Sequence, residues 1–183
     1  PQADWGQQAV IDAGLEDLAQ VRFSDYRDVP ESGFDAISSI GLTEHIGEAN
    51  YPAYFRTLRS KVKPEGRLLN HSIPRFNDKQ KVWYRNSFVN RYIFPDGEIT
   101  GPAKIVTALT GENWELQHEE NIRVHYAKTL HCWRMNLEEN WDAAVAEVGE
   151  RKARVWRLYM AASEFGFTHN IIQLHQFLAT NTV

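Results

Sequence analysis

The sequence lacks three features that would assign it to a class at once. Its 183 residues hold a single cysteine, Cys132, which excludes an intramolecular disulfide framework and fits a reducing cytoplasm. Lys and Arg number 20 against 24 Asp and Glu, so the basic excess typical of nucleic-acid-binding proteins is missing. No apolar run approaches the roughly 20 residues of a membrane span, and no signal sequence is found. We expect a cytoplasmic protein that does not bind nucleic acid.

An initiating methionine is also missing, because the chain starts at Pro1 within a polar stretch. We expect a processed chain or a fragment of a longer protein. The content of 43% hydrophobic and 24% charged residues is enough to bury one core. No repeat, low-complexity tract or linker divides the sequence, which favours a single folded portion over residues 1–183.

Alternating strands and helices are predicted for the first part of the chain. The patterns indicate a short helix over 7–14, strands over 19–26, 34–41 and 67–73, and a helix over 50–66. The Ile-rich segment 34–41 is typical of a strand covered on both faces. Strand, helix, strand, each turned by Gly or Pro, predicts a parallel α/β sheet with right-handed crossovers.

The second part is less regular at first. Residues 74–100 are aromatic and basic, and we interpret them as an inserted helical or lid segment. Within it, 82–95 suits either a packed surface or contact with anionic lipid headgroups. A helix over 102–111, a strand over 114–122, helices over 126–148 and 150–165 and a strand over 171–179 are predicted to follow.

Ionisable side chains stand where two neighbouring predicted strands end. Glu44 and His45 follow strand 34–41, and His71 lies at the end of strand 67–73. Open α/β sheets bind ligands beyond the carboxyl ends of their strands. A carboxylate and an imidazole there suit acid–base chemistry or the binding of an anion. A polar loop that caps the next helix, with a hydrogen-bonded core histidine beside it, explains the same residues.

Several other candidate site residues have both a functional and a purely structural interpretation. Asp25 and Tyr26 suit contact with an adenine ring and equally suit a turn. Tyr126 offers a hydroxyl to an anion, although tyrosines near a helix start often only pack. The spacing of His125, His131 and Cys132 fits no strong zinc pattern, so we expect no metal site.

Six blocks of sequence, spread over nearly the whole chain, resemble one family in order and spacing. They are GLEDLAQVRFSDYRDV, FDAISSIGLTEHIG, NYPAYFRTLRSKVKPEGRLLNHSI, NRYIFPDGEI, HYAKTLHCW and IIQLHQFLAT. The family is that of the cyclopropane-fatty-acyl-phospholipid synthases and their mycolic acid synthase relatives. The resemblance implies a class I S-adenosylmethionine-dependent methyltransferase with a Rossmann-like α/β fold, of which residues 1–183 would be the C-terminal portion.

The resemblance also implies a reaction and a set of site residues. The family methylates a cis double bond in a phospholipid acyl chain at the membrane surface, and a bound bicarbonate removes a proton to close the ring. By resemblance the bicarbonate site is formed by Glu44, His71, Ile73 through its backbone, and Tyr126. The positions implied to bind S-adenosylmethionine are Asp25 and Tyr26, at the adenine, and Ile40 and Gly41, in the pocket wall.

The chain departs from the family pattern in ways that limit these expectations. The Gly-rich loop after the first strand, an upstream cysteine of the bicarbonate site and an N-terminal helical region are absent. We therefore expect this chain alone to bind the cofactor poorly and to turn over little. Thr43 and His175 replace aromatic residues, and the motifs look closest to actinobacterial members, some of which make methylene or methyl-branched chains.

Three alternatives to ring formation stay open. They are a methylene or methyl-branched product, methyl transfer to another small molecule, and a non-catalytic interaction module. A sheet without its first strands would expose edges that invite self-association, so a homo-oligomer is included among the expected partners.

Overall fold

A computed structural model describes residues 1–79 and 87–182. The chain divides into two compact units, residues 1–31 and residues 32–183. In the described part of the chain, no helix is both long enough and apolar enough to cross a membrane. The prediction of one methyltransferase portion over residues 1–183 stays a prediction.

The first unit holds a helix and a segment that is not a strand. Helix α1 spans Gln2–Asp12, and the 3-10 helix η1 spans Tyr26–Asp28. The predicted strand over 19–26 is therefore wrong, although Val21 and Phe23 alternate with polar residues as a strand would. A strand needs a hydrogen-bonded neighbour, and the Val21 N–H instead donates to Gln7 Oε1 at 2.7 Å. Phe23 is 98% exposed, so its alternation buries nothing.

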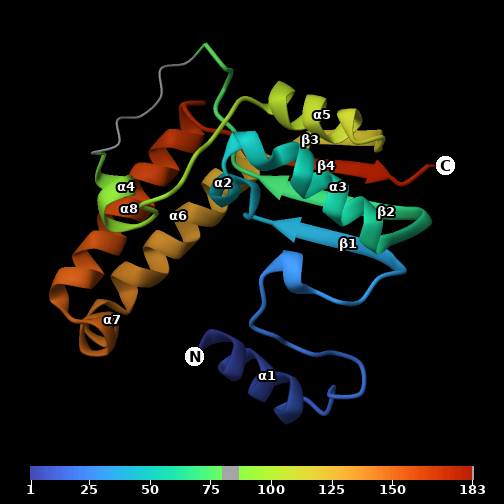
Figure 1. The fold of residues 1–183 in the computed structure, drawn as a ribbon. Coiled ribbons are helices and arrows are strands. Elements are labelled where there is room, and N and C mark those ends of the chain that lie inside the picture. The colour runs from blue at the N-terminus through green and yellow to red at the C-terminus, as the bar shows by residue number, and fades with distance from the viewer. Residues whose placement is uncertain (80–86, 183) are drawn as a thin grey trace. The chain divides into compact units, whose positions relative to one another are not determined.

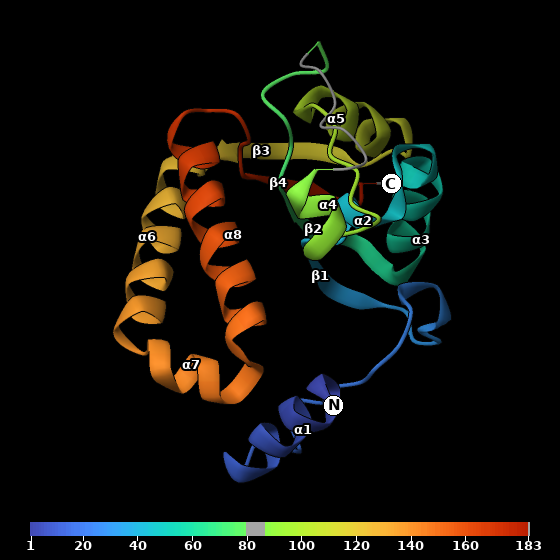
Figure 2. The same cartoon turned by 90° about the vertical axis from the view of Figure 1, so that its left-hand side faces the viewer.

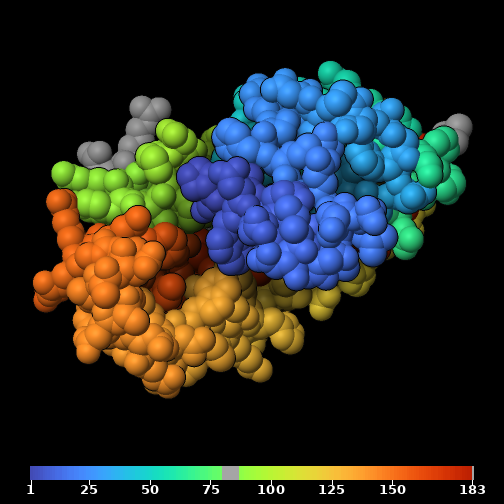
Figure 3. Space-filling model, turned by 90° about the horizontal axis from the view of Figure 1, so that it is seen from below, coloured from blue at the N-terminus to red at the C-terminus, as the bar shows by residue number. Residues whose placement is uncertain are grey.

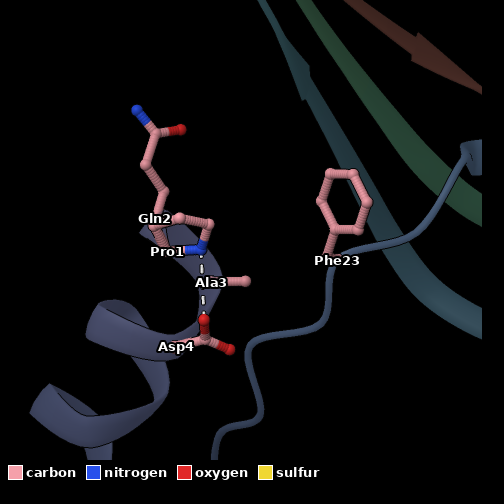
Figure 4. A pocket seen from close by; sticks show the side chains of 5 residues that line it. All are labelled: Pro1, Gln2, Ala3, Asp4 and Phe23. Atoms are coloured by element: carbon pink, nitrogen blue, oxygen red, sulfur yellow. Dashed lines mark ion pairs between the residues drawn. The ribbon is translucent and has the colours of Figure 1, made fainter.

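A shallow depression of about 410 Å³ lies within this unit, between the start of α1 and Phe23. Figure 4 shows the Phe23 ring across from the first turn of the helix, where the Pro1 amino group pairs with Asp4 at 3.1 Å. Both partners of that pair are highly exposed, so the pair is expected to stabilise little. The depression coincides with none of the predicted site residues.

The second unit is built on a four-stranded mixed sheet (Figure 1). Strands β1 (Phe34–Ile40), β2 (Val62–Ser72), β3 (Glu115–Asn121) and β4 (His175–Thr180) lie in the order β1-β2-β4-β3. β1 and β2 are parallel, as predicted, but β4 is antiparallel to both of its neighbours. The expectation of a parallel sheet is thus corrected for β4, since hydrophobic periodicity carries no information about strand direction.

Two helices cover one face of the sheet. Helices α3 (Tyr51–Lys61) and α5 (Pro102–Gly111) lie on the same side of the strands in Figures 1 and 2. Helix α3 lies within the predicted helix 50–66, and its side chains of Tyr54, Phe55 and Leu58 are buried. They form the core together with residues of β2, α5 and β4, among them Leu68, Leu109 and Phe177. Trp114 is buried in the same core, and its Nε1 donates a hydrogen bond to the Phe55 carbonyl oxygen at 3.0 Å.

β1 is less covered than its composition indicated. Ser39 is its one buried residue, in contact with the Tyr54 hydroxyl, whereas Ile40 is 67% exposed. The expectation that 34–41 is covered on both faces is wrong. Ile-rich composition favours a strand, but the burial of a strand depends on which helices pack against each face.

Between β3 and β4 the chain forms a helical hairpin. Helices α6 (Arg123–Glu139) and α8 (Glu150–Thr168) run side by side and are joined by α7 (Trp141–Val148), as Figure 2 shows. In the space-filling view the orange surface of these helices forms one continuous block (Figure 3). The predicted helical regions are confirmed, with a break at Asn140 between α6 and α7.

Short elements complete the unit. They are α2 (Thr43–Ile46), η2 (Glu48–Asn50) and α4 (Phe88–Tyr92). Helix α4 lies in the segment 74–100 for which an inserted helical or lid region was predicted. Residues 80–86 of that segment, including part of the aromatic and basic stretch 82–95, lie outside the described residues.

Candidate active site at the ends of β1 and β2

The parallel pairing of β1 with β2 brings the predicted strand-end residues together. Ile40 is the register partner of His71, and the Gly41 N–H donates to the His71 carbonyl oxygen at 2.8 Å. Just beyond, the Ile73 N–H donates to Glu44 Oε1 at 2.5 Å. The backbone that follows β2 thus meets the Glu44 side chain that follows β1. The predicted pairing of the His71 ring with Glu44 stays a prediction.

Glu44 is a buried carboxyl group with unused hydrogen-bonding capacity. Glu44 belongs to helix α2, and the residue is 7% exposed. Burial raises the pKa of Glu44, although the Ile73 N–H opposes the shift by stabilising the ionised form. Its other oxygen, Oε2, is buried without a hydrogen-bond partner among the described residues. A buried acceptor of this kind suits a ligand that donates an O–H or N–H.

The backbone around Glu44 is fixed by residues of the predicted lid segment 74–100, which the sequence did not place at the site. The Glu98 N–H donates to the Glu44 carbonyl oxygen at 2.7 Å. Glu98 Oε2 in turn accepts from the Glu48 N–H at 3.0 Å. The ring of Phe94 lies 5.3 Å from that of His45, between ring centroids. No sequence pattern links residues 94–98 to α2, because the contact is set only by the tertiary fold.

Tyr126 lies near the start of α6 with its ring held between aromatic side chains. The ring meets Phe167 edge-on at 4.9 Å and Trp133 at 5.9 Å, measured between centroids. Burial raises the pKa of the Tyr126 hydroxyl, and the neighbouring acidic groups Tyr159 and Glu44 raise it further whenever they are ionised. The hydroxyl therefore stays protonated at neutral pH and can donate a hydrogen bond.

His71 faces a partner that only the antiparallel position of β4 could provide. Its Nδ1 lies 3.1 Å from Gln176 Nε2, and the two residues are register partners. Burial lowers the pKa of His71, which favours the neutral ring. Because an amide nitrogen only donates, Nδ1 accepts and Nε2 carries the proton. His71 can thus donate from Nε2 to an anion.

The residues predicted to bind the cofactor divide between the two units. Asp25 caps η1 and its carboxylate binds Arg27, whose hydrogen bonds lower the Asp25 pKa to about 2. Tyr26 is the first residue of η1, so neither residue lies at the end of a strand. In the second unit Ile40 is exposed, and Gly41 has φ of 67° with open space where a Cβ would lie. A shared cofactor site stays a prediction.

Of the residues considered for zinc, His131 pairs with a carboxylate. His131 Nδ1 lies 3.0 Å from Glu164 Oε1. The other oxygen of this carboxylate, Oε2, accepts a hydrogen bond from Arg134 Nε at 2.7 Å. Cys132 is exposed. Across residues 1–79 and 87–182, no three His, Cys, Asp or Glu side chains are grouped to hold a metal ion.

Comparison with protein families gives one match over almost the whole chain. Residues 1–177 match the family described as Mycolic acid cyclopropane synthetase. A Mycobacterium tuberculosis protein named Probable fatty acid methyltransferase Rv3720 is 59% identical over 179 residues, covering 98% of this chain and 42% of that protein. The Escherichia coli cyclopropane-fatty-acyl-phospholipid synthase is 30% identical over 171 residues, covering 93% and 44%. The chain therefore spans less than half the length of these relatives.

Solved structures share the fold. The mycolic acid cyclopropane synthase CmaA1, complexed with SAH and CTAB, superimposes with a TM-score of 0.86 at 25% identity, covering 98% of this chain and 66% of that one. The cyclopropane synthase MmaA2 from Mycobacterium tuberculosis gives a TM-score of 0.83 at 22% identity. The α/β fold is that of the class I S-adenosylmethionine-dependent methyltransferases, as the sequence predicted.

Proposed function

Because the chain belongs to the mycolic acid cyclopropane synthetase family, we propose that it carries the anion-binding part of a lipid-modifying methyltransferase. The reaction is methyl transfer from S-adenosylmethionine to the cis double bond of an unsaturated phospholipid acyl chain, followed by proton loss to give a cyclopropane. The observation that carries this proposal is the buried Glu44 Oε2, which has no described hydrogen-bond partner at the ends of two parallel strands.

Glu44, His71 and Tyr126 offer hydrogen-bonding groups of the kinds that a bicarbonate ion would need. Bicarbonate supplies a base and combines one O–H donor with acceptor oxygens. Glu44 Oε2 can accept from such an O–H, while Tyr126 and His71 Nε2 can donate to the oxygens. Ile73 contributes through its N–H, which holds the Glu44 carboxylate rather than the anion itself. These groups are already oriented by hydrogen bonds and packing, which lowers the cost of ordering them during the reaction.

The strand end fits the cofactor as well. The open space at Gly41, with its positive φ, lets a ligand approach the backbone closely. A side chain at this position would be strained and would narrow that approach. Ile40 presents an exposed apolar side chain to the same end of β1. S-adenosylmethionine supplies the methyl group, and these residues would form one wall of its site.

A methyl-branched or methylene product is the second candidate. The relative with 59% identity is named a fatty acid methyltransferase, whereas the named cyclopropane synthase of E. coli is 30% identical. The same methyl transfer leads to a ring when the new methyl group loses a proton as the carbocation closes on it, and to an exocyclic methylene when a hydride first shifts to the cationic carbon. A saturated methyl branch forms only if a separate hydride donor then reduces the methylene. The active-site residues described above serve both reactions.

Mass spectrometry of lipids separates the candidates. Cells that express the whole gene product containing this chain are expected to accumulate acyl chains with one added carbon. A cyclopropane resists mild hydrogenation, whereas an exocyclic methylene is reduced. Activity should fall when bicarbonate is depleted. Unchanged lipids, with the protein present and folded, would contradict the proposal, and activity that ignores bicarbonate would favour another methyltransferase reaction.

We also propose that the protein acts in the cytoplasm at the membrane surface, and that residues 1–183 alone bind S-adenosylmethionine weakly. Titration calorimetry with this chain is expected to show little binding heat, while a longer gene product that includes the upstream region should bind. Tight binding by residues 1–183 alone would contradict the second statement. Sedimentation with anionic vesicles tests the first.

Replacing Tyr126 by Phe is expected to lower turnover about 10-fold to 100-fold, because it removes one hydrogen-bond donor to the anion and leaves the ring packing in place. The measurement is methyl transfer at saturating substrate. Tyr92→Phe is the matched control, since Tyr92 is 46% exposed. Equal activity of Tyr126→Phe and the unmodified enzyme would remove Tyr126 from the site.

A further inference from the structure

A buried polar cluster lies where β3 and β4 pair, and the proposed reaction does not use it. His175, the first residue of β4, is 5% exposed. Its Nδ1 contacts Glu119 Oε1 on β3, and its Nε2 lies 2.8 Å from Gln173 Oε1. The ring also stacks on Phe177, with 5.8 Å between centroids. Both ring nitrogens are therefore engaged by side-chain oxygens.

The Gln173 amide bridges Asn170 and His175. Gln173 Nε2 donates to Asn170 Oδ1 at 2.8 Å, and Gln173 Oε1 faces His175 Nε2. A carboxylate oxygen and an amide oxygen can only accept. A neutral imidazole has one N–H, whereas an imidazolium has two, and only the imidazolium can donate to both oxygens.

The surroundings of the ring supply one balancing charge. Its register partners, Ser72 on β2 and Asn121 on β3, are uncharged, as are Gln173 and Phe177. Glu119 is a charged group in direct contact with the ring, through its Oε1 and the ring Nδ1. The Glu119 side chain is 37% exposed, so the carboxylate keeps part of its hydration while it pairs with the buried ring.

We infer that His175 is an imidazolium that bridges Glu119 and Gln173 and acts as a positioning residue for the site at Glu44 and Tyr126. The Gln173 N–H donates to the Pro74 carbonyl oxygen at 2.9 Å, directly after Ile73, whose N–H holds Glu44. Leu174 accepts from the Ile122 N–H at 2.8 Å, at the start of α6. The cluster thus fixes both backbone segments that carry the site.

Apolar packing also joins the polar cluster around His175 to the site residues Ile73 and Tyr126. Leu174, which lies between Gln173 and His175, is buried with Leu130 and Phe167, and both Ile73 and Tyr126 pack against this group. A change in the β3–β4 pairing at His175 would therefore shift the support of two site residues. The role in the reaction depends on the proposed function, whereas the charge state of the ring does not.

Nitrogen NMR of the protein labelled with ¹⁵N-histidine tests the charge state directly. At neutral pH the His175 ring is expected to show two N–H groups. Glu119→Gln should leave a single ring N–H, because an acceptor-only partner has been replaced. Glu120→Gln is the matched control: Glu120 is the next residue of β3 and lies 4.0 Å from the exposed His118. A His175 ring with one N–H in the unmodified protein would overturn the inference.

Kinetics test the positioning role. Glu119→Gln, within the whole gene product, is expected to lower kcat about tenfold or more while the KM for S-adenosylmethionine stays unchanged, because a small displacement of site residues acts mainly on the chemical step. Glu120→Gln should match the unmodified enzyme. An unchanged kcat for Glu119→Gln, with the ring proton lost, would overturn the positioning role. If the unmodified enzyme transfers no methyl group to lipid, the proposed function fails and the NMR result still decides the charge state.

Discussion

Replacing Glu44 by Gln is expected to lower methyl transfer by about 10²-fold to 10⁴-fold, the range found when a group that acts on proton transfer is removed. Gln is close in size to Glu and its Oε1 can still accept from the Ile73 N–H. The amide nitrogen that replaces Oε2 cannot accept an O–H, so the bound anion loses its anchor. The measurement is turnover of the folded variant.

The same substitution is expected to increase stability at neutral pH. Burial raises the Glu44 pKa above the ordinary 4.5, so the folded protein binds the proton more tightly than the unfolded chain. Below the pKa that Glu44 has in the unfolded chain, the group is protonated in both states and burying it costs no charge desolvation. As the pH rises through the higher pKa of the folded protein, the carboxylate ionises while buried, and this destabilises the fold. Glu44→Gln removes this cost, so its advantage in unfolding free energy should grow as the pH rises from the ordinary pKa of 4.5 through the raised pKa of the folded protein.

Thermal unfolding across that pH range is the check, with Glu139→Gln as the control because Glu139 is an exposed residue at the end of α6. A variant at Glu44 that is fully active would remove the residue from the site. A stability difference that does not change with pH would contradict the effect of burial on the carboxyl group.

Replacing Phe167 by Ala is expected to reduce the free energy of unfolding by about 3–5 kcal/mol, as is typical when a buried aromatic ring is truncated. Phe167 is 1% exposed and packs with Leu130 and Leu174 between α8, α6 and the start of β4. Its ring also supports Tyr126 edge-on. Chemical denaturation measures the loss in stability, and turnover should fall further than stability alone explains.

Phe165→Ala is the matched control for this experiment. Phe165 lies on the same helix, two residues earlier, and is 56% exposed. Its truncation should change the unfolding free energy by no more than about 0.5 kcal/mol. Comparable losses at the two positions would show that the α6–α8 packing described above is wrong.

Local patterns predicted those parts of the fold that depend on neighbouring residues. The predicted helix over 50–66 contains α3, in which Tyr54, Phe55 and Leu58 are buried at helical spacing, and the predicted strand over 34–41 matches β1. The parallel pairing of β1 with β2 followed from the intervening helix, and it brought Glu44 to the end of β2 as expected.

Features that depend on contacts between distant parts of the chain could not be predicted from local sequence patterns. The alternation of Val21 and Phe23 predicted a strand, but no described neighbour pairs with that backbone. The direction of β4 is not encoded in its periodicity, so the contact of Gln176 with His71 was missed. Glu98 is likewise brought to Glu44 only by the tertiary fold.

The position of β4 has a consequence for how the sheet is completed during synthesis. β4 follows the other three described strands along the chain, yet it lies between β2 and β3 and hydrogen-bonds to both. β3 therefore has no described neighbour within the sheet until residues 175–180 have left the ribosome. Pairings between segments far apart in sequence form slowly because closing a long loop costs entropy before any contact is gained. A chain that stalls before His175 would leave β2 and β3 with unpaired edges exposed to other unfolded chains.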